Sequence, residues 1–455
     1  MSAVKRFQSH PVDKGLRGKV RVPGDKSMSH RAVMLSSLAQ GTSNITGLLE
    51  GEDVLATLNA FRAMGVQAKG PSRGKLTIIG RGMHGLTQPS VDLDMGNSGT
   101  AMRLLAGILA AQQFPSKLVG DESLTARPMR RITVPLTAMG AKCVTDDDGS
   151  PPIHIRAVSK LEPIEYKLPI ASAQIKSCIL LAGMYADGET SVTEPAPTRD
   201  HTERMLSAYG YPCDVVKVDN VTTTIKIKGG GELSAADIEI PADISSAAFF
   251  MVAASIIPGS KIVLQHVGVN PTRTGIIDIL RSMGADIQLL NKRTIGASGD
   301  ADANGGTSGR GEPVADIQVS YVGLKGTEID PDLVPLAIDE FPVICIAAAC
   351  AEGETKITGA SELRHKESDR ISAMIAGLTA VGVDVTEYRD GMTVRGGAIK
   401  GGTVESFHDH RIAMSFAVAA GVAEAPVIIN DVANVATSFP NFAKLANKSG
   451  LHIVE

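Results

Sequence analysis

The chain has 455 residues, 43% hydrophobic and 21% charged, and its 45 Lys and Arg against 49 Asp and Glu give a formal net charge of −4. This composition excludes a wholly disordered chain, and the acidic balance and 4% aromatic content disfavour nucleic-acid binding. The five cysteines are scattered without a CxxC pair, which indicates neither a disulfide framework nor a zinc site. We see no secretory signal and no apolar run that would span a bilayer, so we expect a cytoplasmic protein that binds neither nucleic acid nor membrane.

One pattern recurs along the chain: a helix of small apolar residues, a Gly-containing turn, a short strand, and an amphipathic helix that ends at Gly. The small-residue helices lack a polar face, so we expect them to be buried all round. In three copies they are predicted at 172–185, 245–257 and 340–351. The amphipathic helices of the same copies are predicted at 202–209, 274–283 and 369–381. Strands are predicted at 19–22, 75–79, 222–227, 317–322 and 392–395.

The glycines that end the amphipathic helices define the repeat. They are Gly65, Gly140, Gly210, Gly284, Gly382 and Gly450, at intervals of 75, 70, 74, 98 and 68 residues. The long interval contains a Gly-, Ser- and Asp-rich stretch at about 291–313, which predicts a flexible surface loop. We therefore predict an α/β protein of six βαβαββ repeats in two lobes of three. Repeats 1–3 would form a lobe over 23–240, and 1–22 with 241–455 would form the other.

Several predicted helices begin with a cation, which opposes the positive end of the helix dipole. Lys26, Arg31 and Arg411 stand at buried helix starts, and Arg127, Arg199, Arg273, Arg364, Lys366 and Arg370 stand near the outer ones. One explanation is a bound anion with several phosphate or carboxylate groups. The alternative is salt bridges to nearby acids such as Asp25, Asp200, Glu367 and Asp409. A metal at His408, Asp409 and His410 is disfavoured because Arg411 is adjacent.

Several strings resemble one family over essentially the whole chain. They are Pro-Gly-Asp-Lys-Ser-Met-Ser-His-Arg at 23–31, Gly-Asn-Ser-Gly-Thr-Ala-Met-Arg at 96–103, the segment 363–370, Asp-His-Arg at 409–411 and Thr-Ser-Phe-Pro at 437–440. These resemble the 3-phosphoshikimate 1-carboxyvinyltransferase (EPSP synthase) family. The strings at 172–174 and 198–203 are more similar to its class II bacterial branch than to class I.

The resemblance implies a two-lobed inverse α/β barrel of six βαβαββ units. It also implies transfer of the enolpyruvyl group of phosphoenolpyruvate to the 5-hydroxyl of shikimate 3-phosphate, without metal or organic cofactor. We further expect a monomer, and we expect glyphosate to inhibit it. The implied contacts of shikimate 3-phosphate are Lys26, Ser27, Arg31, Ser172, Ala173, Gln174, Arg199, Asp339 and Lys366. Those of phosphoenolpyruvate are Lys26, Gly99, Arg127, Gln174, Glu367, Arg370, His410 and Arg411.

The residue types suit this chemistry. Asp339 would accept the hydroxyl proton, while Glu367 and Lys26 would deliver and remove the proton at the methylene carbon. Arg127, Arg370 and Arg411 would hold carboxylate and phosphate. Two positions depart from or vary within the family. Thr437 stands where many class I members carry Lys, and Gly99, which is Ala in some glyphosate-tolerant members, would leave room for glyphosate.

Three other functions deserve comparison. Enzymes that transfer enolpyruvyl to UDP-N-acetylglucosamine use a Cys on a mobile loop, whereas Cys143 lies in an apparent strand. A non-catalytic phospho-metabolite sensor on the same scaffold would not need Glu367 and Asp339, which are both present. A nucleic-acid end-processing enzyme of similar repeats conflicts with the net charge of −4.

Overall fold

The computed structural model describes residues 5–219, 221–296 and 311–455, which form two compact units. Unit 1 comprises Met1–Pro23, Pro241–Arg293 and Pro313–Glu455, and unit 2 comprises Gly24–Ile240 and Thr294–Glu312. The sequence-based division places 294–312 with residues 241–455, whereas the described part of this segment belongs to unit 2. Arg204 of unit 2 donates a 2.9 Å hydrogen bond to the carbonyl of Gly311.

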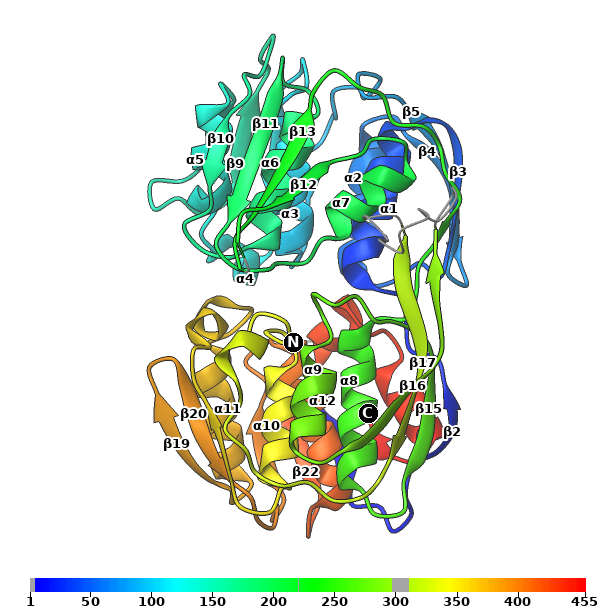
Figure 1. Cartoon of the computed structure of the whole chain (residues 1–455), viewed down its shortest axis with the longest axis vertical. Helices are drawn as coiled ribbons and strands as arrows, with labels where there is room; N and C mark the ends of the chain where they lie inside the picture. The colour runs from blue at the N-terminus through cyan, green and yellow to red at the C-terminus, as the bar shows by residue number, and fades with distance from the viewer. Residues whose placement is uncertain (1–4, 220, 297–310) are drawn as a thin grey trace. The chain divides into compact units, whose positions relative to one another are not determined.

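Unit 2 is built around three buried helices (Figure 1). They are α1 (Lys26–Leu38), α3 (Gly99–Leu109) and α6 (Ala173–Gly183), and α3 packs against both of the others. The outer helices are α2 (Glu52–Ala63), α5 (Arg130–Ala138) and α7 (His201–Ala208). A short helix, α4 (Glu122–Thr125), precedes α5 in the chain. Small side chains let α1 be buried on all sides, and its internal hydroxyls are satisfied: Ser37 donates to the carbonyl of Val33 at 2.7 Å.

Three four-stranded sheets surround these helices in the described part of unit 2, in the orders β14-β3-β5-β4, β6-β7-β9-β8 and β10-β11-β13-β12. In each sheet the first pair of strands is parallel and the remaining pairs are antiparallel. The strands are β3 (Gln40–Thr46), β4 (Gln67–Ser72), β5 (Lys75–Arg81), β6 (Leu93–Asp94), β7 (Ser116–Val119), β8 (Lys142–Val144), β9 (Ile153–Arg156), β10 (Glu165–Lys167), β11 (Glu189–Glu194), β12 (Asp214–Lys217), β13 (Thr223–Lys228) and β14 (Ile238–Glu239).

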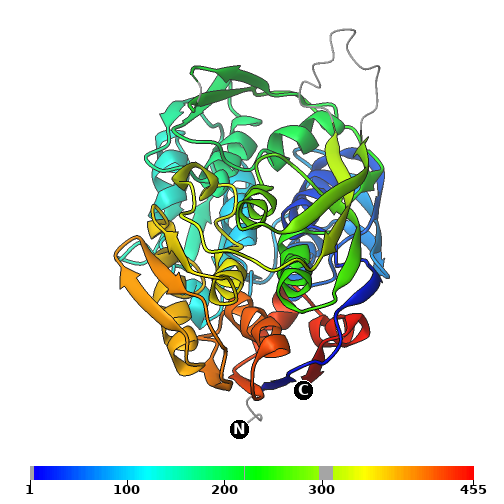
Figure 2. The ribbon, with the colours of Figure 1, turned by 60° about the horizontal axis from the view of Figure 1, so that its bottom comes forward.

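Unit 1 repeats this plan. Its buried helices α8 (Ile244–Ile256), α10 (Phe341–Ala349) and α12 (His410–Ala419) pack against one another. The outer helices are α9 (Gly275–Ser282), α11 (Arg370–Ala380) and α13 (Phe442–Ser449). Short 3₁₀ helices are η1 (Pro331–Leu333), η2 (Ser361–His365), η3 (Ala420–Val422) and η4 (Ala433–Thr437). Figure 2 gives a second view, in which the orange hairpin of β19 (Asp384–Tyr388) and β20 (Gly391–Arg395) stands at the edge of the unit.

The sheets of unit 1 have the orders β16-β17-β15-β2, β18-β20-β19 and β21-β22-β1-β23. The third sheet joins both ends of the described chain, because β1 pairs with β22 on one side and with β23 on the other. The remaining strands are β1 (Phe7–His10), β2 (Arg17–Val20), β15 (Lys261–Gly268), β16 (Asp286–Ile295), β17 (Glu312–Ser320), β18 (Glu354–Ile357), β21 (Gly402–Glu405), β22 (Val427–Asn430) and β23 (His452–Val454).

The repeat predicted from glycine spacing is confirmed by the geometry of the helix ends. All six closing glycines have positive φ, between 79° and 118°, a conformation that costs glycine little. At each end the N–H of the residue after the glycine bonds back to a carbonyl in the last turn, as Val66 does to Phe61 and Val383 to Leu378. These six ends share the same hydrogen-bond pattern, which stops each outer helix and starts the next strand.

The loop predicted at about 291–313 is shorter at both ends than expected. Strand β16 continues to Ile295 and β17 begins at Glu312, while 297–310 lie outside the described residues. Polar residues at the end of β16 misled the prediction: most of them are exposed, so a strand tolerates them, and Asn291 donates a 2.8 Å hydrogen bond to Asp316 on β17. The strand predicted at 317–322 correspondingly ends at Ser320.

Candidate active site

Lys26 is the first residue of α1, and Ser27 follows it. The carboxylate of Asp25 caps this helix by accepting a 2.8 Å hydrogen bond from the N–H of Met28. Lys26 forms an ion pair with Asp53 at the start of α2. The acid that pairs with Lys26 in this contact is therefore Asp53 of the next helix, rather than a neighbour in the sequence.

Arg31 joins three helices of unit 2. It is 4% exposed, and its guanidinium donates to Thr202 Oγ1 on α7 at 2.7 Å, to Ser177 Oγ on α6 at 2.8 Å and to the carbonyl of Ser27 at 3.0 Å. This burial was not expected for a substrate contact. Arg31 thus stabilises the packing of the helix starts as well as bringing a positive charge to them.

Gly99 begins α3 beside two guanidinium groups. A Cβ atom on Gly99 would lie 3.3 Å from Arg127 Nη1 and 3.4 Å from Arg103 Nη1. Arg127 also donates to Asn97 Oδ1 at 2.7 Å. We had not expected Arg103 among the site residues. The signal was available, because a residue four positions after Gly99 on a helix shares its face.

The first turn of α6 contacts Arg103 through Gln174. Ser172 is the N-cap of α6, and its hydroxyl accepts a 3.4 Å hydrogen bond from the N–H of Ile175. After Ala173, Gln174 accepts a 2.5 Å hydrogen bond from Arg103 and donates a 2.9 Å bond to Thr100 on α3. Unit 2 therefore brings Gly99, Arg103, Arg127 and Gln174 together. Arg199 is partly buried and precedes Asp200, the N-cap of α7.

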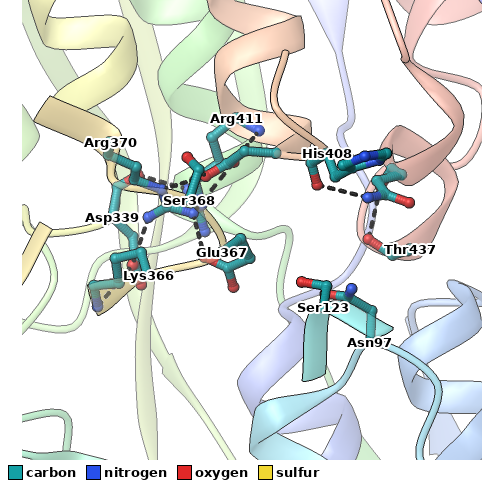
Figure 3. A network of polar contacts seen from close by, with 12 residues as sticks. Asn97, Ser123, Asp339, Lys366, Glu367, Ser368, Arg370, His408, Arg411 and Thr437 are labelled. Carbon is teal, nitrogen blue, oxygen red and sulfur yellow. Dashed lines mark hydrogen bonds and ion pairs between the residues drawn. The ribbon is translucent and has the colours of Figure 1, made fainter. Parts of the chain in front are cut away.

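In unit 1, Asp339 lies between two cations. Its Oδ1 is 3.3 Å from Lys366 Nζ and 3.2 Å from Arg370 Nη1. The backbone carbonyl of Asp339 also accepts a 2.9 Å hydrogen bond from Arg411. Figure 3 shows these side chains converging from the segment before α10, from the turn before α11 and from α12.

Arg370 is the centre of this cluster. It is buried, and it pairs with Glu367 at 2.7 Å and with Asp409 at 2.8 Å as well as with Asp339. Burial alone would lower the pKa of Arg370, but the three carboxylates outweigh it and raise that pKa. Burial works to raise the pKa of Asp409, yet the adjacent Arg370 charge prevails and holds it below its usual range. Both groups therefore stay ionised at neutral pH.

Asp409 also organises the start of α12. Its Oδ1 caps the helix by accepting a 2.9 Å hydrogen bond from the N–H of Arg411, and its Oδ2 accepts a 3.1 Å bond from Ser368. His410, the first residue of α12, is 6% exposed. Arg411 Nη1 lies 3.6 Å from Glu340 Oε1. Glu340, Ser368 and Asp409 were not among the expected site residues.

Two cations near outer helices form ion pairs within their own unit. Arg273 is 3% exposed and bonds to Asp243 at 3.1 Å and to Ser245 at 2.7 Å. Arg364 bonds to Asp369 at 2.8 Å and to Glu387 at 2.9 Å. Both satisfy their charge within the protein, as the salt-bridge alternative states.

The expected residues thus form two groups, each described within its own unit. In unit 1 the cations Lys366, Arg370 and Arg411 stand among four carboxylates, those of Asp339, Glu340, Glu367 and Asp409. This group is not an uncompensated positive patch, so it offers carboxylates held by cations for proton transfer. In unit 2, Arg103 donates to Gln174 and Arg127 donates to Asn97, so both guanidiniums are held beside Gly99.

Among the residues that the structure describes, no group of three or more His, Cys, Asp or Glu side chains is arranged to hold a metal ion. No helix in the described ranges is long and apolar enough to cross a membrane. Thr437 is buried at the end of η4, where its hydroxyl donates a 2.7 Å hydrogen bond to the carbonyl of Asn434.

Comparison with known proteins identifies the fold and the family. The family model for EPSP synthase (3-phosphoshikimate 1-carboxyvinyltransferase) matches residues 12–445. A 3-phosphoshikimate 1-carboxyvinyltransferase of Methylococcus capsulatus is 57% identical over 438 residues, which cover 96% of each chain, and one of Hydrogenovibrio crunogenus is 54% identical over 440 residues, again 96% of each chain.

Solved structures agree with this match. EPSP synthase from Acinetobacter baumannii superposes with a TM-score of 0.85 at 52% identity, over 99% of this chain and 100% of that one. The enolpyruvyl transferase NikO from Streptomyces tendae has a TM-score of 0.75 at 16% identity, over 99% of this chain and 98% of that one, which shows a shared fold. The fold is the two-lobed inverse α/β barrel, and the chain belongs to the EPSP synthase family.

Proposed function

We propose that this enzyme transfers the enolpyruvyl group of phosphoenolpyruvate to the 5-hydroxyl of shikimate 3-phosphate, in the shikimate pathway to chorismate and the aromatic amino acids. Membership of the family supports the reaction. The observation that carries it to particular residues is the cluster in which Asp339 and Glu367 are both held by Arg370. Two carboxylates fixed by one cation suit a reaction that moves protons at both an oxygen and a carbon.

We assign the substrates to the residues expected from the resemblance. Shikimate 3-phosphate would contact the starts of α1 and α6 (Lys26, Ser27, Arg31, Ser172, Ala173, Gln174), together with Arg199, Asp339 and Lys366. Phosphoenolpyruvate would contact Lys26, Gly99, Arg127, Gln174, Glu367, Arg370, His410 and Arg411. We add Arg103 to the phosphoenolpyruvate set because it lies beside Gly99, as Arg127 does, and donates a hydrogen bond to Gln174.

The reaction would proceed by addition and elimination. Phosphoenolpyruvate gains a proton at its methylene carbon while C2 accepts the 5-hydroxyl, whose proton passes to Asp339. The tetrahedral adduct then loses phosphate and a proton of the new methyl group. Glu367 and Lys26 would exchange the carbon-bound proton, and fixed guanidinium groups would stabilise the charge of the adduct without reorganising.

Glyphosate, a phosphonate, is the inhibitor we expect at the phosphoenolpyruvate site, where Gly99 supports it by adding no side chain beside Arg103 and Arg127. We further propose a cytoplasmic monomer. Free cysteines support a reducing compartment: the described chain holds Cys143, Cys178, Cys213, Cys345 and Cys350 as thiols.

The nearest alternative substrate is UDP-N-acetylglucosamine. Cys143 argues against it, because the residue lies within β8 and burial raises the pKa of its thiol to about 12, which makes it a poor acid–base group at neutral pH. A non-catalytic sensor is disfavoured because it would not require Asp339 and Glu367.

The test is phosphate release from phosphoenolpyruvate, measured with each acceptor in turn. We expect release with shikimate 3-phosphate and none above background with UDP-N-acetylglucosamine. Release only with the nucleotide sugar would replace the proposed substrate, and release with neither acceptor would favour the sensor.

A further inference from the structure

A buried ion cluster in unit 2 has no part in the chemistry proposed above. Lys176 on α6 has its Nζ 3.0 Å from Glu194 Oε2 and 2.7 Å from Glu203 Oε1. The lysine side chain is 1% exposed, and the two carboxylates are 6% and 7% exposed. A buried lysine with two buried glutamates is uncommon, because each charge loses its hydration.

Stability alone does not account for this cluster. Replacing buried ion pairs by apolar side chains of similar volume is often neutral or stabilising. A charge cluster does, however, fix the relative placement of the segments that supply its members, because removing any partner leaves a costly unpaired charge. The segments joined here are therefore informative.

Each member of the cluster belongs to a segment that carries an expected contact of shikimate 3-phosphate. Lys176 lies one turn after Ser172, and its N–H donates to the Ser172 carbonyl at 3.1 Å. Glu194 is the last residue of β11, at the start of the connection that contains Arg199. Glu203 lies in the first turn of α7, which follows Arg199.

A direct hydrogen bond extends the cluster to the neighbour of Arg199. Thr198 donates from its hydroxyl to Glu194 Oε2 at 2.6 Å, and the same oxygen receives Lys176. The peptide that precedes Arg199 is therefore tied through one carboxylate to α6.

A second set of contacts runs beside the first. Ser177 and Thr202, the chain neighbours of Lys176 and Glu203, share a 2.7 Å hydrogen bond between their hydroxyls. Arg31 donates to both of them. Two neighbouring sets of contacts thus connect the starts of α1, α6 and α7, which are labelled in Figure 1.

Lys176 keeps its charge, so it does not act as a base. Burial works to lower its pKa, but the charges of Glu203 and Glu194 outweigh burial and raise it. A lysine that stays protonated acts by holding its partners in position.

We propose that Lys176, with Glu194 and Thr198, positions the shikimate 3-phosphate subsite by fixing the Arg199 segment against the first turn of α6. This inference rests on the proposed function. Loss of the contact would let Arg199 and Ser172 move apart and weaken the binding of shikimate 3-phosphate, while the contacts of phosphoenolpyruvate on α3 and in unit 1 stay intact.

The test compares Thr198→Val, which removes only the hydroxyl donor, with Thr198→Ser, which keeps it. We expect Thr198→Val to raise KM for shikimate 3-phosphate about 5- to 10-fold and to weaken its calorimetric binding equally, with KM for phosphoenolpyruvate and kcat within about threefold. Thr198→Ser should restore the wild-type values. Folded Lys176→Met protein should show a larger rise in KM for shikimate 3-phosphate.

Thr224→Val is the matched control, because it removes a 2.9 Å hydroxyl contact between Thr193 and Thr224 in the same sheet. We expect wild-type kinetics from it. An unchanged KM for shikimate 3-phosphate in Thr198→Val, or an equal rise in both KM values, would overturn the positioning role. Absence of shikimate 3-phosphate-dependent phosphate release in the wild-type enzyme would instead overturn the proposed function.

Discussion

Arg370 and Asp409 form an ion pair in which Nε lies 2.8 Å from Oδ2 and both side chains are at most 1% exposed. Asp409 simultaneously caps α12, and Arg370 simultaneously holds Asp339 and Glu367. One buried contact therefore supports the helix that presents Arg411 and the two carboxylates to which we assign proton transfer.

Asp409→Asn should damage both stability and turnover. The change leaves the Arg370 charge buried with fewer anionic partners, and loss of one member of a buried pair costs about 3–5 kcal/mol. We expect a fall in unfolding free energy of that order in urea denaturation and a kcat at least tenfold lower. Asp384→Asn is the control, because its pair with Arg395 is at the surface and its loss should leave both quantities unchanged. Equal behaviour of the two variants would contradict the role of Asp409.

Glu367→Gln and Asp339→Ala should each lower kcat by about 10²-fold or more, the scale of lost acid–base assistance. Glutamine keeps the shape of Glu367 and an oxygen for Arg370, but it removes the carboxylate that would exchange the proton and the charge that pairs with Arg370. Glu387→Gln, at an exposed carboxylate that bonds to Arg364, should retain wild-type turnover in the same phosphate-release assay. Near-wild-type rates in both active-site variants would remove the proposed mechanism.

Gly99→Ala should raise the inhibition constant of glyphosate about tenfold or more and raise KM for phosphoenolpyruvate less. The new methyl group would lie 3.3–3.4 Å from nitrogens of Arg127 and Arg103, so both guanidiniums must shift by a few tenths of an ångström. Steady-state inhibition measures both constants. Gly397→Ala, where a Cβ meets no atom within 4 Å, should change neither. An unchanged inhibition constant in Gly99→Ala would show that glyphosate does not lie beside this residue.

His30 should make the fold sensitive to acid. Burial, reinforced by Lys26 and Arg31, holds the pKa of His30 well below its usual 6.5. Its ring bonds to Thr57 at 2.8 Å and lies 3.4 Å from Ser98 Oγ. The unfolded chain therefore binds a proton below pH ~6.5 that the folded chain does not. The contribution of neutral His30 to the free energy of unfolding is complete above pH ~6.5 and is lost as the pH falls.

Comparison with His30→Asn isolates the pH-dependent stability that comes from His30. Between pH 7.5 and 5.5 the wild-type unfolding free energy should fall by about 1.4 kcal/mol more than that of the variant, in urea denaturation. Equal falls in the two proteins would mean that folding does not lower the pKa of His30.

Local features made the repeats predictable. A single glycine indicates a left-handed helix end, and a short run of small apolar residues indicates a buried helix. The helix ends at Gly65 and Gly382 were predictable in this way. Pairing between distant segments is not marked in this way. No local pattern indicated that β1 would lie between β22 and β23.

The site shows the same division. Lys26, Gly99 and Gln174 were identifiable from motifs at helix starts. The partners of the charges were not, because Asp53 reaches Lys26 from another helix and Asp409 reaches Arg370 from 39 residues away. A positive charge at a helix start therefore indicated a charge with a partner in the protein, Asp53 for Lys26 and Asp243 for Arg273, but not which residue that partner would be.

The most direct test of the central claim is the fate of the bridging oxygen of phosphoenolpyruvate. Substrate labelled with ¹⁸O between C2 and phosphorus would be incubated with the enzyme and shikimate 3-phosphate, and the phosphate and organic products analysed by mass spectrometry. Enolpyruvyl transfer breaks the C–O bond, so the label should appear in inorganic phosphate while the three-carbon unit is found on the shikimate ring. Retention of the label in pyruvate, which requires P–O cleavage, would contradict the account.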